Sequence, residues 1–424
     1  MTIRTIALGL MTGLLAIVPF DSALAQNKPE KLTIISHRVH RSVSTGEQGG
    51  DITKAWKEKH GVDVEWVTLG TGPLHERLFR ELELPESSID IAFLLNTNAF
   101  ADVTSALEPL NSYQDSNPIE DLNDIFPGLR DAMTFNGKMY GIPFRHASSC
   151  FHYNKRILDE LGLTPPKTIE ELSSIARKAT FEKDGKKVHG FVINGQGYAN
   201  VVDLARAWDG DFITLDYQVK TADSGMMNAA KLLRSFYEEK VLPKNWAAIV
   251  DEEINSWMQT GRAAMTITSC GRNRLYNDPE KSQETGNIVT VALPVSASFK
   301  DKFSVAPAKV EFWTMVIPSN SKNKELAWDL VKTMLSKEST FMAAMNGNGP
   351  VRASTYDRAE IKQQLAYSDE EKAVLLVGRV PLPAFENSSR AADIFVEEMQ
   401  AAVLGMKPVE EAMKDIQQRV KPLL

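Results

Sequence analysis

Apolar and polar positions along the first hundred residues predict an order of strand, helix, strand, helix, strand. The segment 31–36 (KLTIIS) is β-branched and 62–69 (VDVEWVTL) alternates with period two, so both are expected to be strands. The segment 89–96 (IDIAFLLN) is a continuous apolar run, typical of a strand buried on both faces. A helix ending at Gly61 lies between the first two strands, after a polar loop at 37–50. This order predicts a parallel sheet covered by helices, which binds ligands beyond the carboxyl ends of its strands.

The stretch 135–154 (FNGKMYGIPFRHASSCFHYN) separates this block from a second one. Asn136 and Gly137 predict a two-residue hairpin turn, because both residues tolerate positive φ. The short strand that follows is expected to end at Pro143, whose ring removes a ladder donor. A new apolar run ends at Asn154, a good N-cap for the helical sequence KRILDELGL. We interpret this stretch as the passage from one globular lobe to another, a place where ligand clefts form.

The same kind of pattern restarts after the passage. Thr168 and Glu171 form a capping box ahead of a helix. Strands are expected at 188–194, 263–268, 287–294 and 313–318, and helices at 200–208, 226–240, 323–336, 389–404 and 409–420. Because 424 residues exceed what one hydrophobic core organises, about two domains are expected.

Composition and the N-terminus bear on where the protein works. The chain is 24% charged and carries a net charge of −7 without basic tracts, so it is a poor nucleic-acid binder. Arg4, the apolar run 6–20 and the small residues ending at Ala25 form a signal-peptide pattern, with cleavage after Ala25. The apolar run is shorter than the roughly 20 residues of a membrane span. Gln26 stands where a lipoprotein needs cysteine, so a soluble periplasmic protein is expected.

Two cysteines, Cys150 and Cys270, lie in predicted strands. They can pair if those strands are neighbours, and an oxidising compartment would preserve the bond. One bridge is unnecessary in a core of this size, so the sequence favours two buried free thiols.

Six motifs then occur in a characteristic order. They are GKMYGIPF, YNKRILDELGLTPPKTIEEL, TGRAAMTI, WTMVIPSNSKNKELAW, NGNGPVRAS and a closing VEEAM helix. Together they resemble the extracellular solute-binding proteins of ABC importers, the carbohydrate-binding family that includes maltose-binding protein. The resemblance covers essentially the whole mature chain. It implies an α/β, two-lobed periplasmic binding protein fold of type II, in which each lobe is a mainly parallel sheet flanked by helices and crossover segments form a hinge.

The family's three crossings imply an N-lobe of 27–141 plus 311–353 and a C-lobe of 142–310 plus 354–424. The resemblance also implies a monomer that captures a sugar, sugar derivative or related polyol between the lobes. It would deliver this solute to ABC permease subunits in the inner membrane, without a cofactor, a metal or enzymatic activity.

Family position and predicted strand ends together indicate the ligand-binding residues. They are His37, Arg38, Asn96, Thr97, Asn98, His146, Gln196, Tyr198, Ser269, Arg272, Glu311, Trp313 and Arg352. Amides, carboxylates and arginines bond sugar hydroxyls, and aromatic rings stack on the apolar faces of sugars. Trp313 is expected to be the stacking platform, the alternative being an ordinary buried tryptophan.

Two alternatives remain open, and a third is disfavoured. Arg38, Arg145, Arg272 and Arg352 are consistent with an anionic sugar (a uronate, phosphate or sulfonate), because arginine binds such groups through two parallel bonds. The plainer interpretation is that these arginines pair with the excess carboxylates or face water. A secreted lyase or glycosidase is also compatible with a carbohydrate cleft, although no Gly-x-Ser-x-Gly elbow is present. Ferric-ion binding would need an adjacent tyrosine pair, which the sequence lacks.

Overall fold

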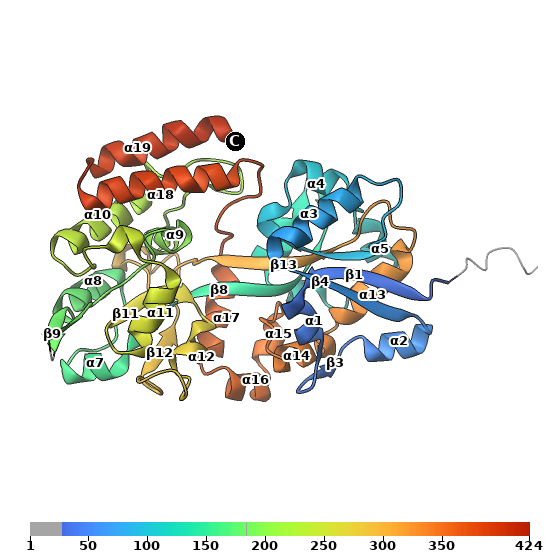
Figure 1. Cartoon of the computed structure of the whole chain (residues 1–424), viewed down its shortest axis with the longest axis horizontal. Coiled ribbons are helices and arrows are strands. Elements are labelled where there is room, and N and C mark those ends of the chain that lie inside the picture. The colour runs from blue at the N-terminus through green and yellow to red at the C-terminus, as the bar shows by residue number, and fades with distance from the viewer. Residues whose placement is uncertain (1–27, 184) are drawn as a thin grey trace, which may run out of the picture.

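The computed structural model describes residues 28–183 and 185–424, so the expected signal peptide lies outside the described residues. Two lobes lie side by side, and the strands β8 (Ile142–Asn154) and β13 (Val310–Val316) run between them (Figure 1). Within the described ranges, no helix is both long and apolar enough to cross a membrane. The protein therefore has the α/β, two-lobed architecture that the sequence predicts.

The N-lobe sheet confirms the predicted strand order. β1 (Lys31–His37) lies parallel between β4 (Asp63–Leu69) and β5 (Ile91–Leu95), and β13 pairs antiparallel with β5. The lobe's main helices are α1 (Arg38–Ser44), α2 (Lys54–His60), α3 (Thr71–Leu82), α13 (Lys324–Met334) and α14 (Lys337–Met345). Gly61 ends α2 with φ 59°, as the sequence predicts.

The polar loop predicted at 37–50 is wrong, because this segment forms α1 and the short hairpin strands β2 (Thr45–Gly46) and β3 (Gly50–Asp51). His37 caps α1 by accepting a hydrogen bond from the Val39 backbone N–H at 3.3 Å. His40, which is fully buried, stacks on Phe93 of β5 with ring centroids 4.2 Å apart. A seven-residue helix is not stable alone, so this tertiary contact decides its formation.

The C-lobe sheet is built around the second half of β8. One edge of β8 pairs with β11 (Met265–Ser269) and the other with β12 (Ile288–Val291), both antiparallel. The segment predicted as a strand at 188–194 joins β11 through isolated parallel bridges at His189 and Val192. The helices of this lobe include α7 (Lys155–Glu160), α8 (Ile169–Lys178), α9 (Ala199–Arg206), α10 (Ser224–Glu238), α11 (Asp251–Gln259), α12 (Arg272–Tyr276), α18 (Ser388–Leu404) and α19 (Val409–Val420).

The passage between the lobes differs from its prediction in one respect. Asn136 and Gly137 have φ of 51° and 76°, which confirms the hairpin turn between β6 (Thr134–Phe135) and β7 (Lys138–Met139). Asn154 caps α7, as predicted, by accepting from the Ile157 N–H at 3.1 Å.

Beyond that turn, one continuous strand of 13 residues replaces the two predicted strands, and Pro143 lies inside it. Pro143 is opposite Thr314, where the register of β8 and β13 shifts. A bulge of this kind tolerates a missing backbone donor, so the proline does not end the strand.

The prediction of two free thiols is wrong, because Cys150 and Cys270 form a disulfide. Cys150 lies in β8 opposite Thr268 of β11, and the Cys270 N–H donates to the Ser148 carbonyl at 2.9 Å. Both cysteines are fully buried. Sheet pairing therefore brings together two residues that are 120 positions apart, and a bridge across so long a loop restricts the unfolded chain strongly.

Each lobe has its own large hydrophobic core. One core lies within 32–144 and 310–351 and includes three later residues, Tyr356, Leu375 and Val380. The other lies within 151–306 and 382–420. The helices α15 (Ala353–Tyr356) and α17 (Ser368–Val377) supply Tyr356 and Leu375 to the first core, beneath the hinge strand in Figure 1.

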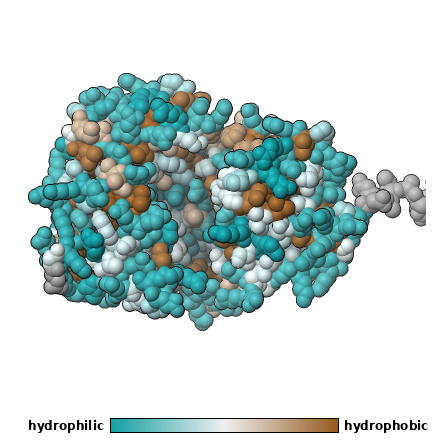
Figure 2. All heavy atoms as spheres, viewed as in Figure 1, coloured by the Kyte–Doolittle hydropathy of each residue, from teal (hydrophilic) through white to brown (hydrophobic). Residues whose placement is uncertain are grey.

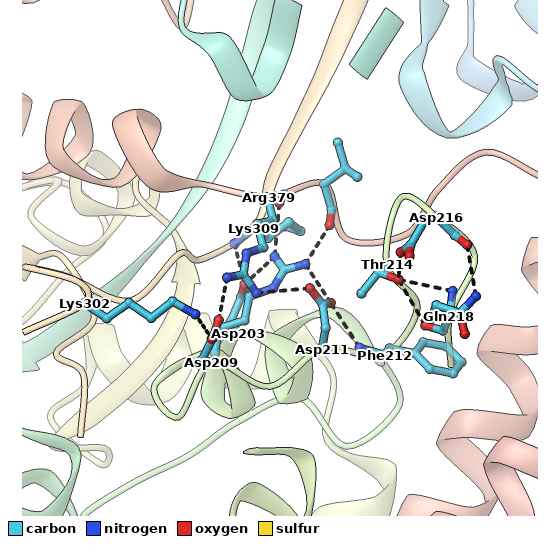
Figure 3. Close-up of polar contacts among 12 residues, drawn as sticks. Asp203, Asp209, Asp211, Phe212, Thr214, Asp216, Gln218, Lys302, Lys309 and Arg379 are labelled. Carbon is cyan, nitrogen blue, oxygen red and sulfur yellow. Dashed lines mark hydrogen bonds and ion pairs between the residues drawn. The ribbon is translucent and has the colours of Figure 1, made fainter. Parts of the chain in front are cut away.

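Helix α9 holds two crossing segments against the C-lobe (Figure 3). The fully buried Arg206 donates to the carbonyl oxygens of Arg379 at 3.0 Å and Val380 at 2.7 Å, just after α17. Asp203, one turn earlier, accepts a hydrogen bond from the Lys309 N–H, just before β13. These contacts attach both segments to α9 of the C-lobe.

Candidate ligand-binding cleft between the lobes

Strand pairing decides which side chains of the hinge face the gap. Trp313 of β13 pairs with Arg145 of β8, and Glu311 pairs with Ala147, so these four side chains share one face of the sheet. Arg145, Glu311 and Trp313 are partly exposed and Ala147 is exposed. The space-filling view shows a hollow running between the two lobes (Figure 2). This face is the floor of the cleft.

The larger cavity at this junction has a volume of about 840 Å³. Its walls come from both lobes and from the hinge strand: Gln48, Ala344 and Gly347 on one side, Arg145 and Ala147 on β8, and Ser269, Gly271, Asn273 and Arg274 on the other. This volume lies in the range of small-molecule sites. The predicted site residue Ser269 lies in this wall.

A smaller cavity of about 180 Å³ brings together four predicted site residues. Thr97 and Asn98 come from a short 3₁₀ turn after β5 and Glu311 from β13, whereas Tyr198 precedes α9 in the C-lobe. Ser388 and Ser389 of α18 complete the wall on the C-lobe side. Burial and the nearby Glu311 carboxylate raise the pKa of Tyr198, so its hydroxyl keeps its proton and can donate a hydrogen bond.

Trp313 is held by two histidines that the sequence did not indicate. The His75 ring stacks on the indole with centroids 5.5 Å apart at 6°, and His40 meets it edge-on at 4.8 Å. A hydrogen bond of 2.8 Å joins the His75 Nδ1 to the side chain of Asn98. Burial lowers the pKa of His75 to about 4, so the ring is neutral near pH 7. Trp313, His75 and Asn98 are thus connected by direct contacts, and of the three only Asn98 lines one of the two cavities.

Arg145 dominates the electrostatics of the cleft floor. Among the residues that the structure describes, no carboxylate lies within 4 Å of its guanidinium, and its buried Nη1 has no hydrogen-bond partner. Burial and the positive charge of Arg145 lower the pKa of His40 to about 2. Burial, then Arg38 and Arg145, lower the pKa of His37. Both imidazoles are therefore neutral, so the charged groups on this sheet face are the Arg145 guanidinium and the Glu311 carboxylate, which form no ion pair within 4 Å.

Several other residues predicted to bind the ligand lie near the cleft but do not line either cavity. His37 and the exposed Arg38 lie at the N-terminus of α1, where the charge of Arg145 contributes to lowering the pKa of His37. Gln196 is exposed, and its Nε2 donates to the Ala247 carbonyl at 3.1 Å. Arg272 is outside the walls of both cavities, whereas Arg274, one position further along α12 than Asn273, lines the larger one.

Three predicted residues serve the framework of the N-lobe instead. Arg352 is fully buried and lines neither cavity, because its guanidinium donates to the carbonyl oxygens of Leu335, Asp121 and Glu120 at 2.6–2.9 Å. Asn96 is buried and its Oδ1 accepts from the Phe312 N–H at 3.0 Å, which ties the turn after β5 to β13.

His146 is the third of these residues. It pairs with Phe312 on the sheet face opposite Trp313, so only its buried flank contributes to the larger cavity. Its Nε2 lies 2.9 Å from the Tyr356 hydroxyl, and burial lowers its pKa to about 3. The neighbouring Arg145 takes the cleft position that the sequence analysis assigned to His146. The pairing register of β8 with β13 decides between the two residues, and no local pattern in the sequence gives that register.

The fold is that of a two-lobed binding protein with a cleft between its lobes. The chain belongs to the family of bacterial extracellular solute-binding proteins, whose sequence profile matches residues 51–368. It is 23% identical over 441 residues to a binding protein of Brucella abortus (strain 2308), covering 100% of both chains.

Two solved structures show the same fold. The sugar-binding protein MalE of Xanthomonas citri has a TM-score of 0.77 at 19% identity, covering 93% of this chain and 97% of that one. A solute-binding protein of Agrobacterium radiobacter K84, in complex with ribitol, has a TM-score of 0.71 at 20% identity, covering 94% and 100%.

Proposed function

We propose that this protein is the sugar- or polyol-binding component of an ABC importer, which captures its solute between the lobes and delivers it to permease subunits in the inner membrane. The observation that carries the proposal is the cavity of about 840 Å³ whose walls come from both lobes and the hinge strand. Family membership and the ribitol in the Agrobacterium relative support a small hydroxylated solute. No catalytic step is assigned to the cleft.

The residues proposed to contact the solute supply the chemistry that hydroxyl groups need. Thr97, Asn98 and Glu311 offer donors and acceptors from the N-lobe, and Tyr198 offers a protonated hydroxyl from the C-lobe. Trp313 offers an apolar ring, one face of which His75 covers. A solute that touches both walls stabilises the closed arrangement by its differential affinity. Micromolar binding supplies about 8 kcal/mol, ample for an equilibrium of a few kcal/mol.

We infer the same lobe division that the family resemblance implies, with 27–141 plus 311–353 in the N-lobe and 142–310 plus 354–424 in the C-lobe. The separate cores support two units. Tyr356, Leu375 and Val380 pack in the first core, so the helices α15 and α17 lie on the N-lobe side although the resemblance assigns their residues to the C-lobe. Export to the periplasm as a monomer, with cleavage after Ala25, completes the proposal.

A thermal-shift screen of the mature protein over sugars, polyols and sugar acids tests the binding function. A true solute raises the melting temperature by mass action, and titration calorimetry then gives its affinity. Small-angle scattering with and without that solute measures closure. A screen in which no hydroxylated compound shifts melting would contradict the proposal. Sustained release of reducing ends from oligosaccharides would instead favour the lyase or glycosidase alternative.

A further inference from the structure

The guanidinium of Arg145 is an unusual group in this molecule. It sits on the cleft floor, part of its surface is buried, and its Nη1 has no hydrogen-bond partner. Elsewhere, the fully buried Arg206 and Arg352 are each held by carbonyl oxygens and by a carboxylate. A buried charge without a partner is costly, and proteins keep one where something else supplies the counter-charge.

The carboxylates around Arg145 either bond to other groups or lie more than 4 Å from its guanidinium. Glu311 shares its sheet face but lies beyond 4 Å. In the wall of the larger cavity, Glu371 accepts from the Ser148 hydroxyl at 2.7 Å and the Tyr356 hydroxyl at 3.0 Å. Asp278 accepts from the Glu280 N–H at 3.0 Å and pairs with Lys281 at 3.4 Å. No carboxylate of the described chain thus pairs directly with Arg145, which leaves its guanidinium able to bond an oxyanion of the solute.

A second arginine, Arg274 of α12, lines the same cavity. It is exposed and has no carboxylate within 4 Å among the described residues, although its charge helps to lower the pKa of Asp278. An oxyanion in this cavity can accept hydrogen bonds from Arg145 on the hinge strand and from Arg274 on α12.

We propose that the solute is an anionic sugar or polyol derivative, whose oxyanion binds Arg145 and Arg274 in this cavity. The proposal rests on the binding function proposed above and narrows its substrate class. Trp313, Glu311 and Asn98 remain for the hydroxylated part of the solute. A carboxylate and a phosphate ester present the same bidentate oxygen geometry to arginine, so both belong to the class.

Titration calorimetry on the mature protein tests the proposal with matched pairs that differ in the charged group. The probes are gluconate and sorbitol 6-phosphate against sorbitol, and galacturonate against galactose, each at low and high salt. We expect at least one acid to bind about tenfold or more tightly than its neutral partner, with a preference that weakens in salt. If only the carboxylates bind more tightly than their neutral partners, the oxyanion is a carboxylate; if only the phosphate does, it is a phosphate; and if both do, the site accepts either group.

Variants locate the effect. Arg145→Gln should remove the preference for the acid while the affinity for the neutral partner changes less than about twofold, and Arg274→Gln should remove part of it. Arg80→Gln, at an exposed site on α3, is the matched control and should keep the full preference. If Arg145→Gln fails to fold, Arg145→Lys and the salt dependence of binding test the role of Arg145. Lysine keeps the charge but not the bidentate hydrogen bonding, so this variant should retain only part of the preference for the acid over its neutral partner.

Two outcomes overturn the inference. Tight binding of neutral sugars or polyols, with no gain from the oxyanion and no effect of salt, would refute the anionic class and leave the proposed function standing. Failure of both neutral and anionic compounds to bind would refute the proposed function as well.

Discussion

The disulfide gives the sharpest test of how this fold is held together. Cys150 and Cys270 close a loop of 120 residues that contains most of the C-lobe sheet, since it runs from β8 to the end of β11. In the chain-entropy account, cross-linking a loop of this length removes unfolded-state freedom worth about 5 kcal/mol. Sheet pairing already fixes both cysteines in the native state, so most of the effect falls on the unfolded chain.

The double variant Cys150→Ala/Cys270→Ala should therefore lose about 2–5 kcal/mol of unfolding free energy, most of it from the C-lobe. Urea unfolding followed by tryptophan fluorescence and circular dichroism measures the loss, and a two-lobed protein is fitted with separate transitions. Wild-type protein that is unfolded and refolded in the presence of a reductant is the matched control, because it lacks the bond but keeps both sulfur atoms in the core. An unchanged urea midpoint in both reduced protein and variant would refute this reasoning.

Three further outcomes are expected. Trp313→Ala should weaken solute binding by about 1–3 kcal/mol. It should also lower the melting temperature, because the indole packs against His75 and His40. If calorimetry shows the same affinity for the variant and the wild type, Trp313 does not stack on the solute. Arg352→Met should lower the free energy of unfolding in urea by about 3–5 kcal/mol and leave solute affinity unchanged, because the guanidinium bonds only the N-lobe framework. A folded variant with reduced affinity would show instead that Arg352 contributes to solute binding. The free energy of unfolding should fall from pH 7 to pH 5. Histidines with a lowered pKa take up a proton below about pH 6.5 only in the unfolded state, which costs up to about 2 kcal/mol of stability for each histidine at pH 5. A urea midpoint that stays constant over this range would contradict the prediction. The residues concerned are His40, His75, His146 and His152, with pKa values of about 2, 4, 3 and 4.

Local sequence determined the parts of this protein whose signals lie within a few residues. The alternation at 62–69 and the apolar run at 89–96 predicted β4 and β5, and Gly61, Asn136-Gly137 and Asn154 set a helix end, a turn and a cap. These features depend on backbone preference and on hydrophobic period, which a single segment carries by itself. The order of the elements and the family motifs then indicated two lobes with a cleft between them.

Tertiary structure decided what depends on partners far along the chain. Stacking of His40 on Phe93 stabilises α1, and pairing of β8 with β11 joins the two cysteines. The register of β8 against β13 turns Arg145 into the cleft and His146 away from it, a one-residue difference that composition does not reveal. The pairing with a neighbouring strand fixes which face of the sheet each side chain lies on. The sequence therefore indicates which segments lie near the cleft, but only the pairing of the strands determines which of their side chains face it.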